Sequence, residues 1–264
     1  MKSRFLVDLA MHRDGLGQMF EAEPIARHEL LYLQTDQKSV ADAGPLLIEP
    51  ASTEAHATYQ SWTEQGLSIK LQSTRSFDYV AAHLRTLTMV RRDQAPTALF
   101  RYADSRLYAG LQAVLGDSER ARLLGPNEAM IGVAGNEPWA LRQPPLDADH
   151  YALAEVPFRL TQEHVKSLQA WRQRAFLQPL ADQHAIPIER LAGWFQQMIA
   201  MGFGNEQACF EGCQRLASLN IDQPISESHC KAIQILQVSW PAKLAALEAR
   251  LVHARGTVQE ARHD

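Results

Sequence analysis

The residues best suited to catalysis are Ser118 and the pair Asp147 and His150. Ser118 ends the tripeptide Gly-Asp-Ser at 116–118, and the pair has the Asp-x-x-His spacing. A serine hydroxyl becomes a nucleophile when a base lies beside it, and a histidine oriented by an aspartate is such a base. Esterases with a Gly-Asp-Ser nucleophile carry the tripeptide after a first strand, whereas here it follows the helical segment 107–115. We interpret it as a turn that stops a helix, and a Gly-Asp-Ser esterase remains the alternative.

Three cysteines and one histidine late in the chain could be read as zinc ligands. Cys209 and Cys213 lie one helical turn apart, and His229 and Cys230 follow them. Structural zinc sites place their cysteine pairs on short loops, whereas this pair continues an apolar helix face with Leu216. We therefore expect buried thiols and no metal. The chain also has no glycine-rich phosphate loop and no His-Glu-x-x-His motif, so we expect no cofactor.

Two arginines and an aspartate interrupt apolar patterns between residues 83 and 111. Arg101 lies between Phe100 and Tyr102 in a segment that is predicted to be a strand. An arginine in such a place needs a partner, and Asp104 at the end of the segment is the nearest candidate. His83 and Arg85 are predicted to lie on the polar side of a helix, and Arg85 could join the pair. We interpret the group as a structural ion pair, with an active-site charge pair as the alternative.

Composition and charge limit the classes of function. The chain has 264 residues, of which 46% are hydrophobic and 21% charged, and its net charge is -4. This charge argues against general binding to nucleic acid or to an anionic membrane. No segment has the roughly 18 apolar residues of a transmembrane helix, and the apolar run at 5–10 is interrupted by Asp8. An odd number of cysteines, all late in the chain, favours the reducing cytoplasm.

The first half of the chain alternates short apolar strands with amphipathic helices. Helical stripes are predicted over 55–62 and 77–87. Such alternation favours an α/β lobe with a mainly parallel sheet, and we place this domain at 1–139. Proline and glycine then interrupt the pattern, so 140–158 is predicted to be a linker. The predicted strands are 5–10, 29–33, 45–49, 68–72, 98–102 and 129–133.

The second half has no strand signal, and residues 159–264 are predicted to form a helical bundle. A helix is expected from Thr161 toward Gln178, a second after Pro187, a third capped by Asn205, and a long last helix from Ser226. The second of these helices and the turn after it carry unusually many large apolar side chains. These residues are core or anchors for a protein partner, and both readings remain open. They are Trp194, Phe195, Met198 and Phe203.

Five short segments form an ordered pattern in the first half of the chain. They are Phe-Leu-Val-Asp-Leu-Ala at 5–10, Gly-Pro-Leu-Leu-Ile-Glu at 44–49, His-Leu-Arg at 83–85, Phe-Arg-Tyr-Ala-Asp at 100–104 and Leu-Gly-Pro at 124–126. In this order and spacing they resemble the adaptor or effector-chaperone family of bacterial type VI secretion systems, whose members are called Tap or Tec proteins. The resemblance covers residues 5–139. Two positions depart from the family pattern, because Ser105 replaces a common proline and Ala103 a second aromatic residue.

The resemblance implies a protein without enzymatic activity or cofactor. Such a protein binds a cognate toxic effector in the producing cell and helps to load it onto the VgrG spike protein. The family supplies no catalytic residues to transfer to this chain, and the resemblance leaves Arg85, Arg101 and Asp104 as a structural signature. A small-molecule-binding α/β regulator is a third possibility, and it predicts a ligand pocket at the carboxyl ends of parallel strands.

Overall fold

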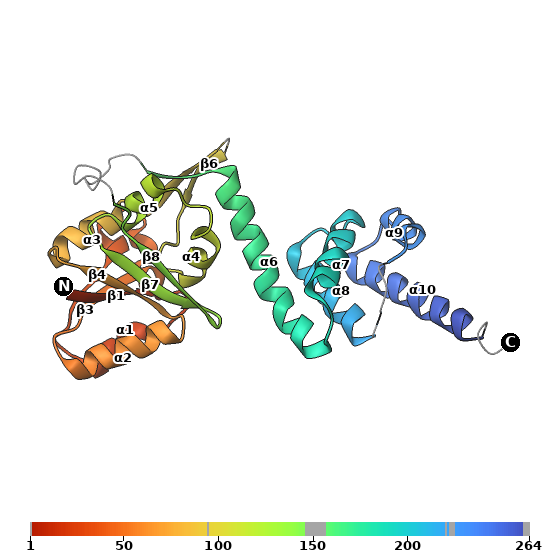
Figure 1. Cartoon of the computed structure of the whole chain (residues 1–264), viewed down its shortest axis with the longest axis horizontal. Coiled ribbons are helices and arrows are strands. Elements are labelled where there is room, and N and C mark those ends of the chain that lie inside the picture. Colours follow the sequence, from red (N-terminus) through yellow and green to blue (C-terminus); the bar gives the residue numbers. More distant parts are fainter. Residues whose placement is uncertain (1, 94, 146–156, 220, 222–224, 261–264) are drawn as a thin grey trace. The chain divides into compact units, whose positions relative to one another are not determined.

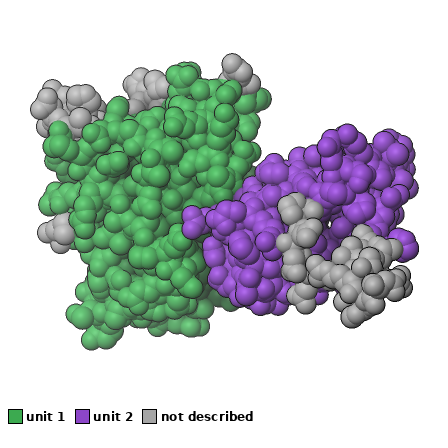
Figure 2. Space-filling model, turned by 45° about the vertical axis from the view of Figure 1, so that its right-hand side comes forward, with its two compact units in different colours: residues 1–171 green, residues 172–264 purple. Residues whose placement is uncertain are grey.

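The computed structural model describes residues 2–93, 95–145, 157–219, 221 and 225–260, with the backbone alone for 254–260. Two compact units divide the chain, residues 1–171 and residues 172–264, as Figure 2 shows in two colours. The sequence predicts a linker at 140–158 between the two domains. The first unit instead extends thirteen residues beyond that segment, and residues 146–156 of the segment lie outside the described part of the chain.

A sheet of six strands forms the centre of the first unit. Its spatial order is β2-β3-β1-β4-β7-β8, and every neighbouring pair is antiparallel. Its first strand lies in the interior, with Phe5 opposite Ile48 on one side and Lys70 on the other. The strands are β1 (Lys2–Asp8), β2 (Arg27–Leu30), β3 (Pro45–Glu49), β4 (Ser68–Ser73), β7 (Ala129–Ala134) and β8 (Glu137–Arg142).

The expectation of a mainly parallel sheet is wrong. Helix α2 (Thr53–Glu64) does connect two parallel strands, β3 and β4, as the alternation suggested. These two strands are not neighbours, because β1 lies between them and is antiparallel to both. The arrangement is a split β-α-β unit. The apolar residues of β1 follow one another without polar alternation, as in strands of parallel sheets, because helices cover both faces of this sheet.

Helices lie on both faces of this sheet, as Figure 1 shows. Helices α1 (Gly15–Ala22) and α2 cover one face, where Phe5 and Val7 of β1 are buried with Met19 and Tyr59. The opposite face carries α3 (Phe77–Arg85), α4 (Ser105–Leu111) and α5 (Asp117–Leu124), together with the short turns η1 (Leu31–Gln34) and η2 (Lys38–Ala43). The first unit is therefore a layered α-β-α structure with an antiparallel sheet.

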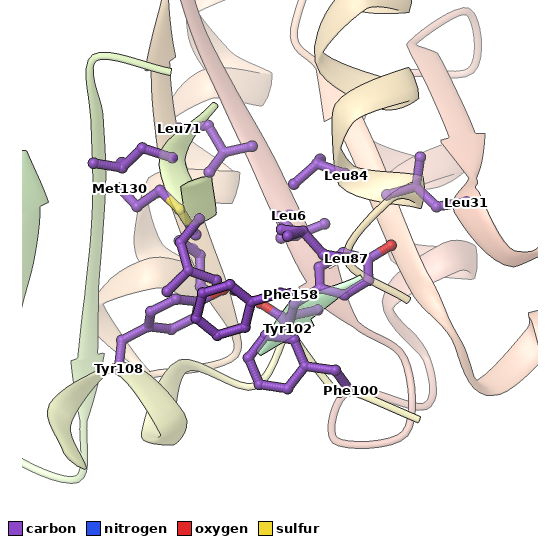
Figure 3. Close-up of a cluster of buried hydrophobic side chains, with 14 of the residues drawn as sticks. Leu6, Leu31, Leu71, Leu84, Leu87, Phe100, Tyr102, Tyr108, Met130 and Phe158 are labelled. Carbon is purple, nitrogen blue, oxygen red and sulfur yellow. Dashed lines mark hydrogen bonds between the residues drawn. The ribbon is translucent and has the colours of Figure 1, made fainter. Parts of the chain in front are cut away.

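The larger core lies on the α3 side, and Figure 3 shows part of it. Leu6, Leu71 and Met130 project from the sheet toward Leu84 of α3 and Tyr108 of α4, and all five are fully buried. A second, three-stranded sheet closes this core. Its order is β6-β5-β9, and its strands are β5 (Met89–Arg92), β6 (Ala95–Leu99) and β9 (Phe158–Leu160).

The small sheet joins distant parts of the first unit. Strand β5 is parallel to β9, with Val90 opposite Phe158, and antiparallel to β6. The rings of Phe100 and Phe158 stack with their centroids 5.9 Å apart. Phe158 and Leu160 of β9 therefore belong to the core of the first unit, and the second unit begins only at residue 172.

The helical character predicted for the second unit is confirmed. Asn205 and Ser226 cap helices through side-chain bonds to Ala208 and His229, as expected. Pro179 lies inside one helix, and the predicted long last helix is two helices separated at 235–239. Their bounds are α6 (Gln162–His184, whose first ten residues belong to the first unit), α7 (Ile188–Ala200), α8 (Glu206–Ser218), α9 (Glu227–Gln234) and α10 (Trp240–Glu260). None of the described helices has the length and apolar character needed to cross a bilayer.

Candidate functional site

The end of β1 carries a buried acid that binds Arg101. Asp8 is 5% exposed, and its Oδ2 accepts a bond of 2.6 Å from Nη2 of Arg101. Its Oδ1 accepts the backbone N–H of Ala10 at 3.0 Å. Burial raises the pKa of Asp8, and Arg101 opposes this by stabilising the carboxylate. Arg101 does not lie in a strand as predicted, because β6 ends at Leu99 and an irregular segment follows.

Asp104 belongs to the same cluster but has a different partner. It caps α4 by accepting the N–H of Arg106 at 3.1 Å. The Arg106 guanidinium also binds both of its carboxylate oxygens, at 2.9 and 2.8 Å. This bond to Asp104 raises the pKa of Arg106. The predicted pair of Arg101 and Asp104 is therefore wrong, and each residue has its own partner of opposite charge.

Arg85, the third signature residue, lies at the end of α3. Its Nη1 forms an ion pair with Glu29 of β2, and both side chains are about one fifth exposed. Arg85 thus joins a helix to the edge strand β2, while Arg101 joins the irregular segment to β1. Arg101 and Asp104 therefore belong to one cluster without binding each other, and Arg85 stabilises the first unit at a separate place.

His83 is buried next to Gly125. The two residues belong to the segments 83–85 and 124–126, which were singled out in the sequence. Its Nε2 lies 3.1 Å from the carbonyl oxygen of Leu123, so Nε2 carries the proton and donates. Burial lowers the pKa of His83 to about 4. Gly125 has a φ of +52°, and any Cβ at this position would collide with the imidazole ring. The sequence placed His83 on a polar helix face, which is wrong, because its exposed fraction is only 2%.

Sequence reasoning missed the structural role of Ser105. The serine is 2% exposed, and its Oγ donates to the carbonyl oxygen of Val133 at 2.6 Å. The same Oγ accepts a bond of 3.0 Å from Nε1 of Trp139. Trp139 also stacks on Tyr108 at 4.8 Å. Ser105 therefore connects α4 to β7 and β8, and the only sequence signal was its departure from the family pattern.

The four candidate partner-binding residues lie in the core of the second unit. Trp194, Phe195, Met198 and Phe203 are each 3% exposed or less. They pack with Leu177 of α6 and with the buried residues of α8 and α10. In this structure none of the four reaches the surface, so they hold the helices together and do not form a docking face.

The residues of the esterase alternative are only partly described. Asp147 and His150 lie outside the described residues. Ser118 is exposed in the first turn of α5, and the N–H of Gly116 donates to Oε2 of Glu119 at 3.0 Å. The Gly-Asp-Ser tripeptide therefore begins a helix, and the expectation that it stops one is wrong.

The described residues bear on two kinds of site weighed above, a zinc site and a ligand pocket at the ends of parallel strands. They contain no group of three or more histidine, cysteine or acidic side chains placed to hold a metal. Burial in α8 raises the pKa of Cys213 to about 12, which disfavours the thiolate. Neighbouring strands of the main sheet are antiparallel and end on opposite sides, so the main sheet does not provide the predicted pocket at the carboxyl ends of parallel strands. The parallel strands β5 and β9 of the small sheet do end beside an open pocket, which is lined by Asp93, Arg159 and Thr161.

One family model matches this chain. Residues 5–122 match the model described as Domain of unknown function (DUF4123). The matched segment runs from β1 to the last turn of α5 and includes Asp8, Arg85, Arg101 and Asp104. No curated protein and no solved structure matches the chain significantly.

Proposed function

We propose that this protein is a non-enzymatic adaptor of a type VI secretion system. It binds a cognate toxic effector inside the producing cell and promotes the loading of that effector onto the VgrG spike. The observation that carries the proposal is the match of residues 5–122 to the DUF4123 family, which is associated with effector adaptors of this secretion system. The matched segment contains four of the five segments that resemble adaptors.

The chemistry of the first unit is consistent with an adaptor. The charges that interrupt its apolar pattern have structural partners, since Arg85 binds Glu29 and Arg101 binds Asp8. Asp104 caps a helix and binds Arg106. The two carboxylates are nearly buried by these bonds, as expected of groups that stabilise the fold.

Within the second unit the effector-binding surface has to be sought on residues other than the predicted ones. Several apolar side chains there are about half exposed or more, among them Phe176, Ile199 and Ile235. Phe176 stacks on Phe210, with 4.4 Å between ring centroids, and Phe210 contacts the buried Phe195 at 5.0 Å. An exposed aromatic ring that is already held by its neighbours loses little conformational entropy on binding, so it is a suitable anchor for a partner.

The proposal is tested by purifying the full chain together with the products of the genes beside its own. We expect a stable complex of fixed stoichiometry with a toxin-like protein, measured by size-exclusion chromatography with light scattering. Deletion of the adaptor gene should abolish recovery of that toxin with VgrG, while VgrG itself is still assembled. A toxin that is loaded equally well without this chain would contradict the proposal.

The esterase alternative is tested on the same preparation. An esterase should hydrolyse short acyl esters of p-nitrophenol, and Ser118→Ala should abolish the turnover. We expect no turnover by either protein, and we expect Ser118→Ala to bind the effector normally because the side chain is exposed at the start of α5. Hydrolysis that depends on Ser118 would make the protein an enzyme.

A further inference from the structure

The ion-pair cluster at the end of β1 has an asymmetric arrangement of charge. Its two carboxylates are nearly buried, with side-chain exposures of 6% for Asp8 and 10% for Asp104. Its two guanidinium groups are far more exposed, at 43% for Arg101 and 46% for Arg106. The cluster is neutral in total, but its positive groups face the solvent while its negative groups lie beneath them.

Both arginines retain hydrogen-bond donors that the fold does not use. Within the described residues the side chain of Arg101 has a single hydrogen bond, from Nη2 to Asp8. Arg106 binds Asp104 through Nε and Nη2, and its Nη1 forms no bond within the same part of the chain. A guanidinium has five N–H donors, and those left over can bind a second carboxylate in the charge-assisted way that arginine favours.

The two guanidinium groups belong to one surface. Asp8 connects them, since its carboxylate binds Arg101 and its carbonyl oxygen accepts the N–H of Met11, whose sulfur contacts Arg106. Met11 is 43% exposed, and its sulfur lies 3.3 Å from Nη2 of Arg106. The surface therefore offers two cationic groups beside a flexible apolar side chain. We name Arg101, Arg106 and Met11 the arginine surface.

From this geometry we infer that the arginine surface docks an acidic segment of a partner protein. A carboxylate of that segment binds the outward donors of Arg101 and Arg106, and an adjacent apolar side chain packs on Met11. The buried Asp8 and Asp104 hold the guanidinium groups in place before the partner arrives, which lowers the entropic cost of binding. The chain's net charge of -4 makes a nucleic acid the poorer partner for the same arginines. The inference rests on the proposed function only in requiring a protein partner.

The test measures fluorescence anisotropy of the full chain with two labelled ten-residue peptides. In one peptide aspartate and leucine alternate, and in the other asparagine replaces every aspartate. We expect the aspartate peptide to bind about tenfold more tightly than its asparagine counterpart, and we expect Arg101→Gln/Arg106→Gln to remove this preference. Equal binding of both peptides by the unaltered chain would overturn the inference.

A matched pair of arginines serves as the control. Arg91 and Arg159 are exposed neighbours across β5 and β9, so Arg91→Gln/Arg159→Gln changes the net charge equally at another surface. The control variant should keep the preference for the aspartate peptide. An equal loss of the peptide preference in both double variants would show that only the net charge matters, and it would overturn the inference. Binding of a ten-nucleotide DNA strand that depends on Arg101 and Arg106, without binding of the peptide, would overturn it as well.

A second variant covers the case in which an unpaired Asp8 prevents folding. Asp8→Asn/Arg101→Gln replaces the ion pair by two neutral groups that can still form a hydrogen bond, and it should lose the peptide preference while remaining folded.

The outcomes also separate the two proposals. Arginine-dependent peptide binding without any effector complex would refute the adaptor role alone. An effector complex that tolerates these variants, together with unchanged peptide binding, would refute this inference alone.

Discussion

A buried histidine makes the stability of the first unit depend on pH. His83 is neutral in the folded chain, because burial lowers its pKa to about 4 from a usual value of 6.5. In the unfolded chain it takes up a proton near its usual pKa. Below pH 6.5 the unfolded state therefore binds more protons than the folded state, and stability falls until about pH 4. Protonation of the imidazole at low pH therefore favours the unfolded state.

We expect the folded state to lose about 3 kcal/mol through His83 as the pH falls from 7.5 to 4. His83→Gln cannot be protonated in this range and should lack that contribution. The measurement is amide hydrogen exchange of α3 and α5 in both proteins across the pH range. Parallel pH profiles for the two proteins would show that His83 does not carry the effect, since His12 and His56 are present in both.

Gly125 gives a second prediction at the scale of a residue. Alanine there would have a φ of +52° and a Cβ inside the His83 ring. Gly135 has a φ of +63° but no atom within 4 Å of the point where a Cβ would lie, so Gly135→Ala tests a positive φ without a steric clash. We expect Gly135→Ala to cost about 1 kcal/mol and Gly125→Ala about 2 kcal/mol more, measured by urea unfolding. Equal costs would contradict the close contact with His83.

The backbone around Ser105 explains why a proline is common at this position in the family that the chain resembles. Ser105 is the first residue of α4, where proline fits, and Asp104 before it is extended with φ -74° and ψ 105°. The serine adds the bridge between Trp139 and Val133. We expect Ser105→Ala to destabilise the first unit by about 2 kcal/mol, because two buried polar groups lose a partner. Ser118→Ala, at an exposed position, should change the urea midpoint little.

At the scale of elements, a lysine joins two helices of the second unit. Lys243 of α10 is 7% exposed, and its Nζ donates to the carbonyl oxygen of Met201 at the end of α7, at 2.7 Å. This carbonyl is one of those that a helix end leaves without a partner inside the helix. The bond therefore satisfies the end of α7 and fixes α10 against it.

We expect Lys243→Met to destabilise the second unit by about 2 kcal/mol, because a charge-assisted bond in a buried place is lost. Lys231→Met is the control, since Lys231 is 70% exposed and, among the described residues, its ion pair is a surface pair with Glu227. The control should change stability by less than about 1 kcal/mol. Faster hydrogen exchange in α7 and α10 of the first variant, but not of the second, would confirm the role of Lys243.

Local signals in the sequence predicted many elements but not how the strands pair. Strand β3 has the predicted bounds, and β4 and β7 differ from theirs by a single residue. Strand β8 was missed because Pro138 argued against a strand, although proline is tolerated at a sheet edge, where β8 lies. The ion-pair partners were also out of reach. Arg101 binds Asp8, which is 93 residues away, whereas sequence reasoning could consider only the nearby Asp104.

At the scale of the whole molecule, the first unit needs more of the chain than the family match covers. Its larger core includes Met130, Trp139 and Leu141 from β7 and β8, and Phe158 from β9. The matched segment ends at residue 122, before all three strands. A fragment that ends there would expose the apolar faces of β4 and α3.

We therefore expect the fragment 1–171 to fold alone and the fragment 1–122 to fail. The longer fragment should show a cooperative thermal transition and a dispersed amide spectrum by nuclear magnetic resonance. The shorter fragment should aggregate or remain without fixed tertiary structure. A cooperative transition in fragment 1–122 would show that β7, β8 and β9 are dispensable for the first unit.

The pairing of β5 with β9 also sets the order in which the protein can mature on the ribosome. Strand β1 emerges first and finds both of its neighbours by residue 73, so the interior of the main sheet can assemble early. Strand β5 must wait for its parallel partner until residue 158 has left the exit tunnel. During that interval the aromatic side chains around Phe100 lack their cover. The nascent chain is therefore most exposed to chaperones and to misassembly while residues 100–158 are being synthesised.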